Sequence, residues 1–250
     1  MNEASKTGQT DAGATTSAGL PGHLTPFIRG MALVARIGLR VTTRVRIEGD
    51  LDAIPRSGPL IIAANHLSNA DGIMVGGWLT PALGRRIHWL GKREFTEFPI
   101  VGRMARAGSV HPVDRDTADI EAFRLAQRIL DEGHVLVVFP EGTRSPTGAL
   151  QLARDGLALL ALRSDAVILP VGVSGTERYW PRGKLPRVGR GRISMRIGRP
   201  FRLSEILPPG TNRKQAKPLA TTAIMARIAA LLPERNRGAY ADAAKAIDAG

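Results

Sequence analysis

The sequence contains no cysteine, and only 4% of its 250 residues are aromatic. The absence of cysteine excludes disulfides, thiolate metal sites and a cysteine nucleophile, although it leaves the cellular compartment open. Proteins that bind single-stranded nucleic acid stack bases on aromatic side chains, and no recognised nucleic-acid-binding motif occurs among the basic clusters. We therefore expect no nucleic-acid partner.

A long apolar run is also missing. No window reaches the roughly 18 uncharged apolar residues of a membrane span, because Arg29, Arg36 and Arg40 interrupt the best candidate. Residues 1–19 have no apolar segment behind a positive start and do not resemble a signal peptide, so we expect residues 1–22 to form a flexible tail. If the protein meets a membrane, we expect it to lie on the surface.

Acidic residues are scarce relative to basic ones. The chain has 22 Asp and Glu against 35 Lys and Arg, which gives a formal net charge of +13. Such an excess attracts anionic surfaces such as nucleic acid, phosphorylated substrates or acidic lipid headgroups, and charge alone does not choose among them. The remaining composition, 43% apolar and 23% charged, is that of an ordinary globular chain with a sizeable core.

Short apolar runs alternate with helical patterns from Arg44 onward, which is typical of an α/β sheet. We expect strands at 45–48, 59–64, 87–90, 109–113, 135–139, 167–173 and 193–197, and helices at 70–80, 96–107, 118–132, 152–163 and 213–232. The expected fold class is α/β, with one domain at 23–232 and a mixed, largely parallel central sheet flanked by helices. Residues 233–250 are Ala-rich and polar, and we expect a C-terminal tail that frays.

An amphipathic pattern precedes this domain core at residues 24–41. Its apolar residues recur at helical spacing with arginines between them; they are Phe27, Met31, Val34, Ile37 and Val41. The pattern is typical of a helix that lies in a membrane interface with a basic edge. It is equally typical of a helix packed on its own domain, since both have the same period.

A second basic segment, rich in Pro and Gly, covers residues 179–192 and reads as a long loop. Its charged residues are Arg182, Lys184, Arg187, Arg190 and Arg192. They could bind phosphates, but charged surface loops are common and a solvated loop is the simpler interpretation.

A histidine and an aspartate follow the expected strand at 59–64, in the segment Asn65-His66-Leu67-Ser68-Asn69-Ala70-Asp71. Active-site groups often lie at such strand ends. A continuous helix would place residues five apart on different faces, so His66 and Asp71 meet only if the chain turns between them. Ser68 and Asn69 are residue types that cap helices and form turns. Asp71 could then fix one imidazole nitrogen and leave the other as a base for a substrate hydroxyl.

A second polar segment follows the expected strand at 135–139 and reads Pro140-Glu141-Gly142-Thr143-Arg144-Ser145. Because both strands end here, we expect the two segments at one edge of the sheet. Gly142 allows close backbone approach, and the planar cation of Arg144 suits phosphate oxygens. Taken singly, a lone His near an Asp is more often structural, and a strand that ends in Pro-Glu-Gly is more often a plain turn.

The two segments together resemble the glycerolipid acyltransferases that include 1-acylglycerol-3-phosphate acyltransferase. The resemblance rests on four blocks in the family's order: the HX4D motif at 65–71, Gly108-Ser109-Val110-His111-Pro112-Val113-Asp114-Arg115, Phe139-Pro140-Glu141-Gly142-Thr143-Arg144-Ser145, and Val167-Ile168-Leu169-Pro170-Val171. The second block departs from the family, which usually has aromatic or aliphatic residues where this chain has His111 and Pro112. That departure leaves the shape of the acceptor pocket open.

The resemblance implies an O-acyltransferase in which His66 is the general base and Asp71 its orienting partner. The acceptor's phosphate site would comprise Arg115, Glu141, Gly142, Thr143 and Arg144. The donor would be acyl-CoA or acyl carrier protein, and the acceptor a lysophospholipid, foremost 1-acyl-sn-glycerol 3-phosphate. A lyso-aminolipid, another lysophospholipid or glycerol 3-phosphate is the alternative acceptor. A peripheral location on the cytoplasmic side of the cell membrane, against anionic lipids, follows from the family and the basic charge.

Lys92 follows the expected strand at 87–90 and could extend the anionic pocket, or it could simply begin a basic surface helix. We expect no metal, because His88, His111 and His134 have no recognised zinc spacing, and no cofactor beyond the donor. A hydrolase would need a protein nucleophile, yet the segment at 172–175 lacks the glycine that a nucleophile elbow requires in register.

Overall fold

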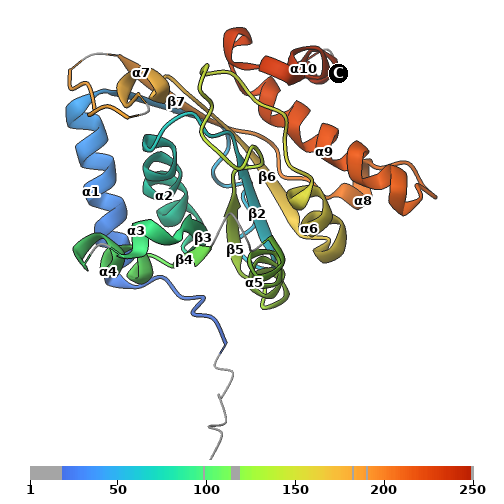
Figure 1. Ribbon diagram of the computed structural model, residues 1–250, viewed down its shortest axis with the longest axis horizontal. Helices are drawn as coiled ribbons and strands as arrows, with labels where there is room; N and C mark the ends of the chain where they lie inside the picture. The colour runs from blue at the N-terminus through green and yellow to red at the C-terminus, as the bar shows by residue number, and fades with distance from the viewer. Residues whose placement is uncertain (1–18, 98, 114–118, 182, 190, 249–250) are drawn as a thin grey trace, which may run out of the picture.

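Seven strands form one sheet in the order β1-β7-β6-β2-β5-β3-β4 (Figure 1). The computed structural model describes residues 19–97, 99–113, 119–181, 183–189 and 191–248. The strands are β1 (Arg44–Glu48), β2 (Leu60–Ala64), β3 (Ile87–Lys92), β4 (Val110–Val113), β5 (Val135–Val138), β6 (Val167–Ser174) and β7 (Arg192–Ile197). Every pairing is parallel except β6 with β7. The predicted fold, a mixed and largely parallel sheet, is confirmed.

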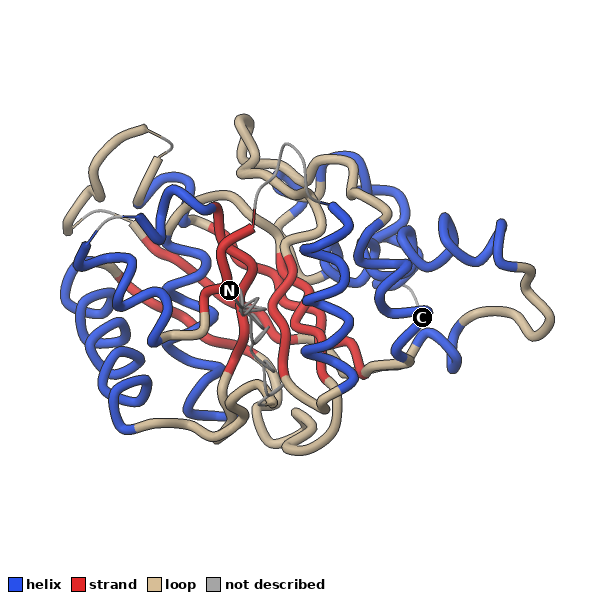
Figure 2. Tube along the Cα trace, turned by 60° about the horizontal axis from the view of Figure 1, so that its bottom comes forward, coloured by secondary structure: helices blue, strands red, loops and turns tan. Residues whose placement is uncertain are grey.

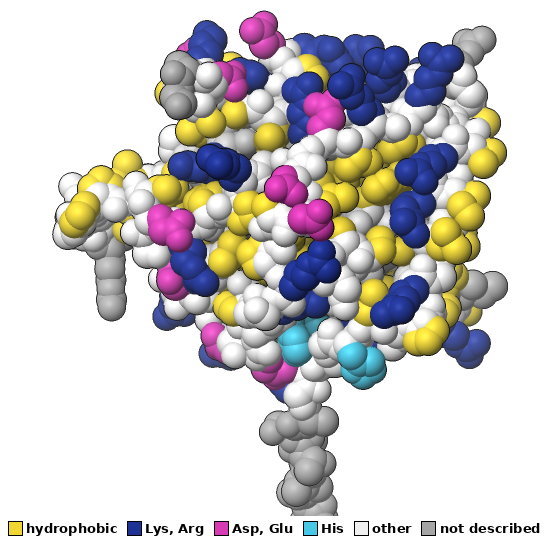
Figure 3. Space-filling model, turned by 180° about the vertical axis from the view of Figure 1, so that it is seen from behind, with side chains coloured by type: hydrophobic (Ala, Val, Ile, Leu, Met, Phe, Trp, Pro, Cys, Tyr) yellow, Lys and Arg dark blue, Asp and Glu magenta, His cyan; other side chains and the backbone are white. Residues whose placement is uncertain are grey.

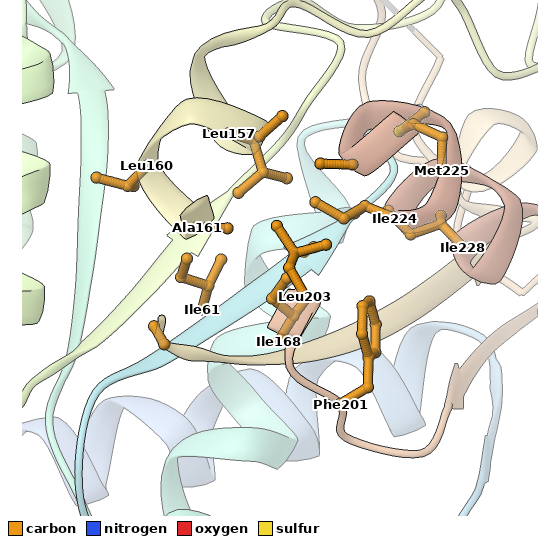
Figure 4. Close-up of a cluster of buried hydrophobic side chains, with 14 of the residues drawn as sticks. Ile61, Leu157, Leu160, Ala161, Ile168, Phe201, Leu203, Ile224, Met225 and Ile228 are labelled. Atoms are coloured by element: carbon orange, nitrogen blue, oxygen red, sulfur yellow. The ribbon is translucent and has the colours of Figure 1, made fainter. Parts of the chain in front are cut away.

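The central strand β2 is buried on both faces, which explains its uninterrupted apolar sequence LIIAA. Leu60 and Ile62 pack on the side of α2 (Ala70–Leu83), in one core cluster. Ile61 and Ala63 point to the other side, where they join α6 (Gly156–Ser164) and α9 (Arg213–Ala230) in a second cluster (Figure 4). Since side chains alternate along a strand, one short segment holds two helical layers together (Figure 2).

The remaining described helices are α1 (Pro26–Thr42), α3 (Arg93–Glu97), α4 (Pro99–Ala107), α5 (Asp119–Asp131), α7 (Thr176–Tyr179), α8 (Leu203–Ile206) and α10 (Ala241–Asp248). The helix expected at 96–107 is therefore two helices, α3 and α4. The helix expected at 152–163 begins only at Gly156. Residues 152–155 are not helical, and two of their backbone N–H groups have tertiary partners: Ala153 donates to the Tyr240 hydroxyl, and Arg154 donates to the Pro140 carbonyl.

Helix α1 has two apolar faces. Ile28, Ala32 and Leu39 are buried, and the helix packs on α2. The face that the sequence pattern singled out is largely solvent-exposed; its exposed members are Phe27, Val34, Ile37 and Val41, with Leu33 beside them, while Met31 is half-buried. The helix therefore packs on its own domain through one face and leaves another apolar face open. Within the described ranges, no helix is both long enough and apolar enough to cross a bilayer.

Both ends of the described chain are anchored. Residues 1–18 of the expected N-terminal tail lie outside the described residues, but the Leu20 backbone N–H donates to Glu132, and the Arg86 backbone N–H donates to the Gly22 carbonyl. At the other end the expected fraying is wrong. Residues 234–248 form two short 3-10 turns and α10, which packs on α9 and buries Tyr240 and Ala244.

Candidate active site

The two polar segments identified in the sequence meet at one edge of the sheet. Strands β2 and β5 are parallel neighbours, with Ala63 opposite Val138, so their carboxyl ends lie side by side. The HX4D segment follows β2 and the Pro140–Ser145 segment follows β5. The backbone N–H of Ser145 donates to the His66 carbonyl over 2.8 Å, which joins the two segments directly. The prediction of a shared edge is confirmed.

His66 and Asp71 lie in hydrogen-bonding contact. The chain turns after His66 and enters α2 at Ala70, so Nδ1 of His66 lies 3.0 Å from Oδ2 of Asp71. The Ser68 side chain makes this turn: its hydroxyl accepts from the Ala70 N–H and donates to the Trp180 carbonyl. A carboxylate at Nδ1 favours the tautomer with the proton on that nitrogen, and Nε2 is then the free base.

The Asp71 carboxylate is fully buried and held by several donors. Oδ2 also accepts from the backbone N–H groups of Leu67 and Ser68, over 2.6 and 2.7 Å, and Oδ1 accepts from the Thr176 hydroxyl over 2.5 Å. Asp71 lies in the first turn of α2, where the helix dipole favours a negative charge. These contacts keep a buried carboxylate in place beside the imidazole.

The His66 ring is packed but still reachable. It stacks on Phe139, with ring centroids 4.2 Å apart and planes 18° from parallel, and its side chain is 17% exposed. One side of the ring is therefore fixed by an aromatic neighbour and one nitrogen by a carboxylate. This arrangement suits a general base, which must reach a substrate proton from a defined position.

Glu141 is buried and ties the two segments together. One carboxylate oxygen accepts from the His66 N–H over 2.8 Å, and the other accepts from the Gln151 N–H over 2.9 Å. Burial raises the pKa of Glu141, and the hydrogen bonds from His66 and Gln151 oppose that rise. Both oxygens thus serve the backbone of the site, and direct contact with a substrate remains a prediction.

Arg144 lies beside the HX4D turn, where its Nη1 donates to Oδ1 of Asn69 over 2.8 Å. Gly142 adopts a φ of +70°, and a Cβ there would come within 2.8 Å of Nε of Arg154. The turn therefore requires glycine, as expected for close backbone approach. Thr143 is exposed next to them. The structure brings Gly142, Thr143 and Arg144 to the His66 turn, while their contact with an acceptor remains a prediction.

One of the described site residues lies away from the His66 turn. Lys92 ends β3, which is two strands away from β2, and its exposed amine pairs with Glu94. Arg115 lies outside the described residues. The roles proposed for both remain predictions.

Two residues that support the site carried no separate signal in the sequence. The side-chain amide of Asn65 donates to the Val173 carbonyl and its oxygen accepts from the Val173 N–H, which links the end of β2 to β6. Thr176, fully buried, reaches Asp71 from the segment after β6. The position of Asn65 directly before His66 could have suggested its role, but no spacing rule joins Thr176 to a residue 105 positions earlier.

Three other histidines gather at the amino ends of the strands, away from the His66 turn. Nδ1 of His88 lies 2.9 Å from Nε2 of His111, and the His88 ring stacks on His111 and His134 with centroid separations of 5.2 Å. The unusual His111 of the second block is thus turned towards His88. In the part of the chain that the structure describes, no three His, Asp or Glu side chains are arranged to hold a metal ion.

Comparisons with known proteins identify the family of this chain. The model of the family described as Acyltransferase matches residues 44–174. A 1-acyl-sn-glycerol-3-phosphate acyltransferase from Cocos nucifera is 28% identical over 187 residues, covering 74% of this chain and 57% of the relative. The lyso-ornithine lipid O-acyltransferase of Pseudomonas aeruginosa is 28% identical over 171 residues, covering 68% of this chain and 62% of the relative.

A solved structure has the same fold. The 1-acyl-sn-glycerophosphate acyltransferase PlsC from Thermotoga maritima superimposes with a TM-score of 0.65 at 22% identity, over 79% of this chain and 76% of that one. The chain spans less than two thirds of the length of the two sequence relatives above. The matched family region, 44–174, contains the His66 turn and the segment of Arg144.

Proposed function

Because the chain belongs to the Acyltransferase family, we propose that it transfers a fatty acyl group from a thioester donor to the free hydroxyl of a lysophospholipid. The contact between His66 and Asp71 carries this proposal. The donor is acyl-CoA or acyl carrier protein, and no other cofactor takes part. The favoured acceptor is 1-acyl-sn-glycerol 3-phosphate, which gives phosphatidic acid.

The reaction starts at Nε2 of His66. This nitrogen removes the acceptor's hydroxyl proton as the oxygen attacks the thioester carbonyl carbon. When the tetrahedral intermediate collapses, the carbon–sulfur bond breaks and the imidazolium returns the proton to the departing sulfur. The products are an ester and a free thiol. Asp71 stabilises the imidazolium, and its four hydrogen-bonded contacts allow it to do so without moving.

Positioning of the acceptor is the second part of the proposal. In the proposal Arg144 binds the acceptor's phosphate, since a guanidinium offers paired donors to phosphate oxygens. Arg144 is held at the turn that carries His66, so a phosphate bound there brings the attached glycerol close to the base. Holding both reactants replaces a bimolecular encounter with a positioned one.

A second acceptor class deserves a direct test because one relative is named lyso-ornithine lipid O-acyltransferase. The chemistry of His66 is the same for any lipid hydroxyl. The acceptors differ in headgroup charge, and a lyso-ornithine lipid has no phosphate for Arg144 to bind. The two candidates therefore differ in how strongly they depend on Arg144.

The exposed face of α1 supports a peripheral membrane location. Five apolar side chains are between 48% and 77% exposed along this helix; they are Phe27, Leu33, Val34, Ile37 and Val41. Such a stripe with arginines at its edges is typical of a helix that lies in a bilayer interface. A lipid acceptor reaches the base from that surface, and the expected site is the cytoplasmic side of the cell membrane.

An acceptor screen tests the proposed function. The purified chain is given one long-chain acyl-CoA and a panel of lysophosphatidic acid, lyso-ornithine lipid, other lysophospholipids and glycerol 3-phosphate, and thiol release and the lipid product are measured together. We expect acylated lysophosphatidic acid in amounts that match the thiol released. Thiol release without an acylated lipid from any acceptor would show a thioesterase and contradict acyl transfer.

A further inference from the structure

A pocket of about 540 Å³ opens where the end of α1 meets the loop before β7. It is lined by Arg40, Val41, Thr42, Thr43, Arg44, Gly189, Gly191 and Arg192. Three of these side chains are arginines, and none of the described residues that line the pocket is a carboxylate. The pocket is therefore strongly positive and lies outside the residues assigned to catalysis.

The two threonine hydroxyls in the pocket wall already have hydrogen-bond partners within the protein. The Thr42 hydroxyl contacts the Gly38 carbonyl and the Tyr179 hydroxyl, and the Thr43 hydroxyl donates to the Gly191 carbonyl. The guanidinium of Arg40 lies 5.5 Å from the ring centroid of Trp78, which orients it. The groups left to bind a ligand are the N–H donors of the arginines.

Two of the arginines face each other without a counter-charge. In the parallel pairing of β1 with β7, Arg44 lies directly opposite Arg192. Within the described residues, neither has an acidic side chain at ion-pair distance. Like charges opposite each other on neighbouring strands are destabilising, so the pair has an electrostatic cost that a bound anion would offset.

Further along the same two strands, two arginines share a carboxylate. Glu48 bonds Arg46 over 2.5 Å and Arg196 over 2.8 Å, so one carboxylate bridges the two strands. One end of the β1–β7 ribbon thus has an internal counter-ion, and the other end has a pocket. The difference points to a ligand with negative charge at the Arg44–Arg192 end.

The pocket lies at the catalytic edge of the sheet. Strand β7 runs antiparallel to β6, and β6 runs parallel to β2, so the amino end of β7 is at the carboxyl end of β2. A Cβ on Gly175 would come within 2.2 Å of the Arg192 carbonyl oxygen, and the next residue, Thr176, bonds Asp71. In Figure 3 the Lys and Arg side chains gather along the top, the end where α7 and the end of α1 lie in Figure 1.

We propose that this pocket binds the phosphate of an anionic membrane lipid and so seats the catalytic edge on the bilayer. Val41, 77% exposed, lines the pocket and ends the apolar stripe of α1. A helix lying in the interface would place its apolar stripe among the acyl chains and the neighbouring arginines at the level of the phosphates. The proposal rests on the peripheral location proposed above but not on any catalytic step.

The lining favours a lipid headgroup over the nucleotide of a donor. No aromatic side chain among the described lining residues could stack on an adenine ring. The pocket is instead continuous with an exposed apolar helix, which a soluble nucleotide would leave in water. Phosphate is also a group that guanidinium forks bind through two parallel hydrogen bonds.

The test measures vesicle binding by the full chain with His66→Ala, so that turnover plays no part. The vesicles are made of phosphatidylcholine with either phosphatidic acid or oleate, in amounts that give the same negative charge. The variant Arg44→Gln/Arg192→Gln is compared with Arg56→Gln/Arg199→Gln, which removes the same charge from exposed positions at the opposite edge of the sheet. We expect the first pair to weaken binding to phosphatidic acid vesicles about tenfold or more, and the control pair less than about threefold.

Further measurements separate binding of a lipid phosphate from binding of negative charge alone and from binding of a soluble phosphate. On oleate vesicles the two double variants should bind alike, and Arg44→Lys/Arg192→Lys, which keeps the charge but loses the guanidinium fork, should be intermediate on phosphatidic acid. The unfolding temperature of Arg44→Gln/Arg192→Gln should be no lower than that of the chain with both arginines, since like charges have been removed. Equal losses in both double variants would overturn the proposal. So would a loss of affinity for CoA or for inorganic phosphate without a change in vesicle binding.

Discussion

One histidine lies at the carboxyl ends of the strands and three lie at the amino ends, and the two groups differ in what surrounds them. At the carboxyl edge, His66 has a buried carboxylate at one nitrogen and is 17% exposed. At the amino edge, His88 is fully buried with histidines as neighbours and no carboxylate bound to its ring in the described residues. Figure 3 shows histidine side chains at the bottom of the molecule, far from the basic edge at the top.

The comparison separates a histidine with a carboxylate partner and access to solvent, which the proposed general base needs, from His88, which has neither within the described part of the chain. Burial lowers the pKa of His88, and the neighbouring basic groups His111, His134 and Arg86 lower it as well. A hydrogen bond to Pro21 opposes them, and together these effects bring the pKa to about 4. Burial also lowers the pKa of His111. These two rings pack against each other, whereas the ring of His66 contacts the Asp71 carboxylate.

The largest expected effect follows removal of the base. His66→Ala should lower kcat/KM for acyl transfer about 10³-fold, because proton removal by a positioned base contributes on that order. The measurement is thiol release with lysophosphatidic acid, with thermal unfolding as the control for folding. His111→Ala is the matched histidine variant and should retain most of the activity. Activity near the wild-type level in His66→Ala would end the proposed mechanism.

The next effect concerns the carboxylate that distinguishes the two edges. Asp71→Asn should lower kcat about a hundredfold with a smaller change in KM, because the imidazolium loses its counter-charge. Thr176→Val removes only one of the donors to Asp71 and should give a smaller loss in the same direction. If Asp71→Asn raised KM and left kcat unchanged, Asp71 would bind substrate and would not orient His66.

A smaller effect is expected at the proposed phosphate site. Arg144→Ala should raise the KM for lysophosphatidic acid about tenfold and leave the KM for acyl-CoA nearly unchanged, since a charged hydrogen bond contributes on the order of 1.5–3 kcal/mol. Arg199→Ala, at an exposed position on the opposite edge, is the matched control. If Arg144→Ala changes only the dependence on acyl-CoA, the phosphate assignment is incorrect.

Much of this comparison could be predicted from the sequence, because the catalytic edge is built from local segments. The strand LIIAA and the turn residues Ser68 and Asn69 lie within a few positions of His66, and their patterns predicted where the dyad would form. The position of Glu141 in the sheet was predicted in the same way, from the end of the expected strand at 135–139. Local order was informative because parallel strands end at one edge.

The parts that could not be predicted depend on contacts between distant segments. Thr176 reaches Asp71 only because β6 is next to β2. The C-terminal α10 is polar in sequence and is held by packing on α9, so composition alone suggested fraying. The three histidines at the amino edge lie on different segments, and no spacing joins them before the sheet is assembled.

The smallest expected effect on activity belongs to His88, and it sharpens the comparison through stability. In the folded protein the pKa of His88 is about 4, below its ordinary 6.5, so the unfolded chain binds more protons between these values. The free energy of unfolding should therefore fall as pH drops from 6.5 to about 4, by an amount on the order of 3 kcal/mol if His88 acts alone. Urea unfolding across this range measures it.

His88→Leu removes the titrating group and should flatten the dependence while leaving activity at neutral pH nearly intact. An unchanged slope would place the acid sensitivity elsewhere, and a loss of acyl transfer at neutral pH would show that the two edges do not act separately.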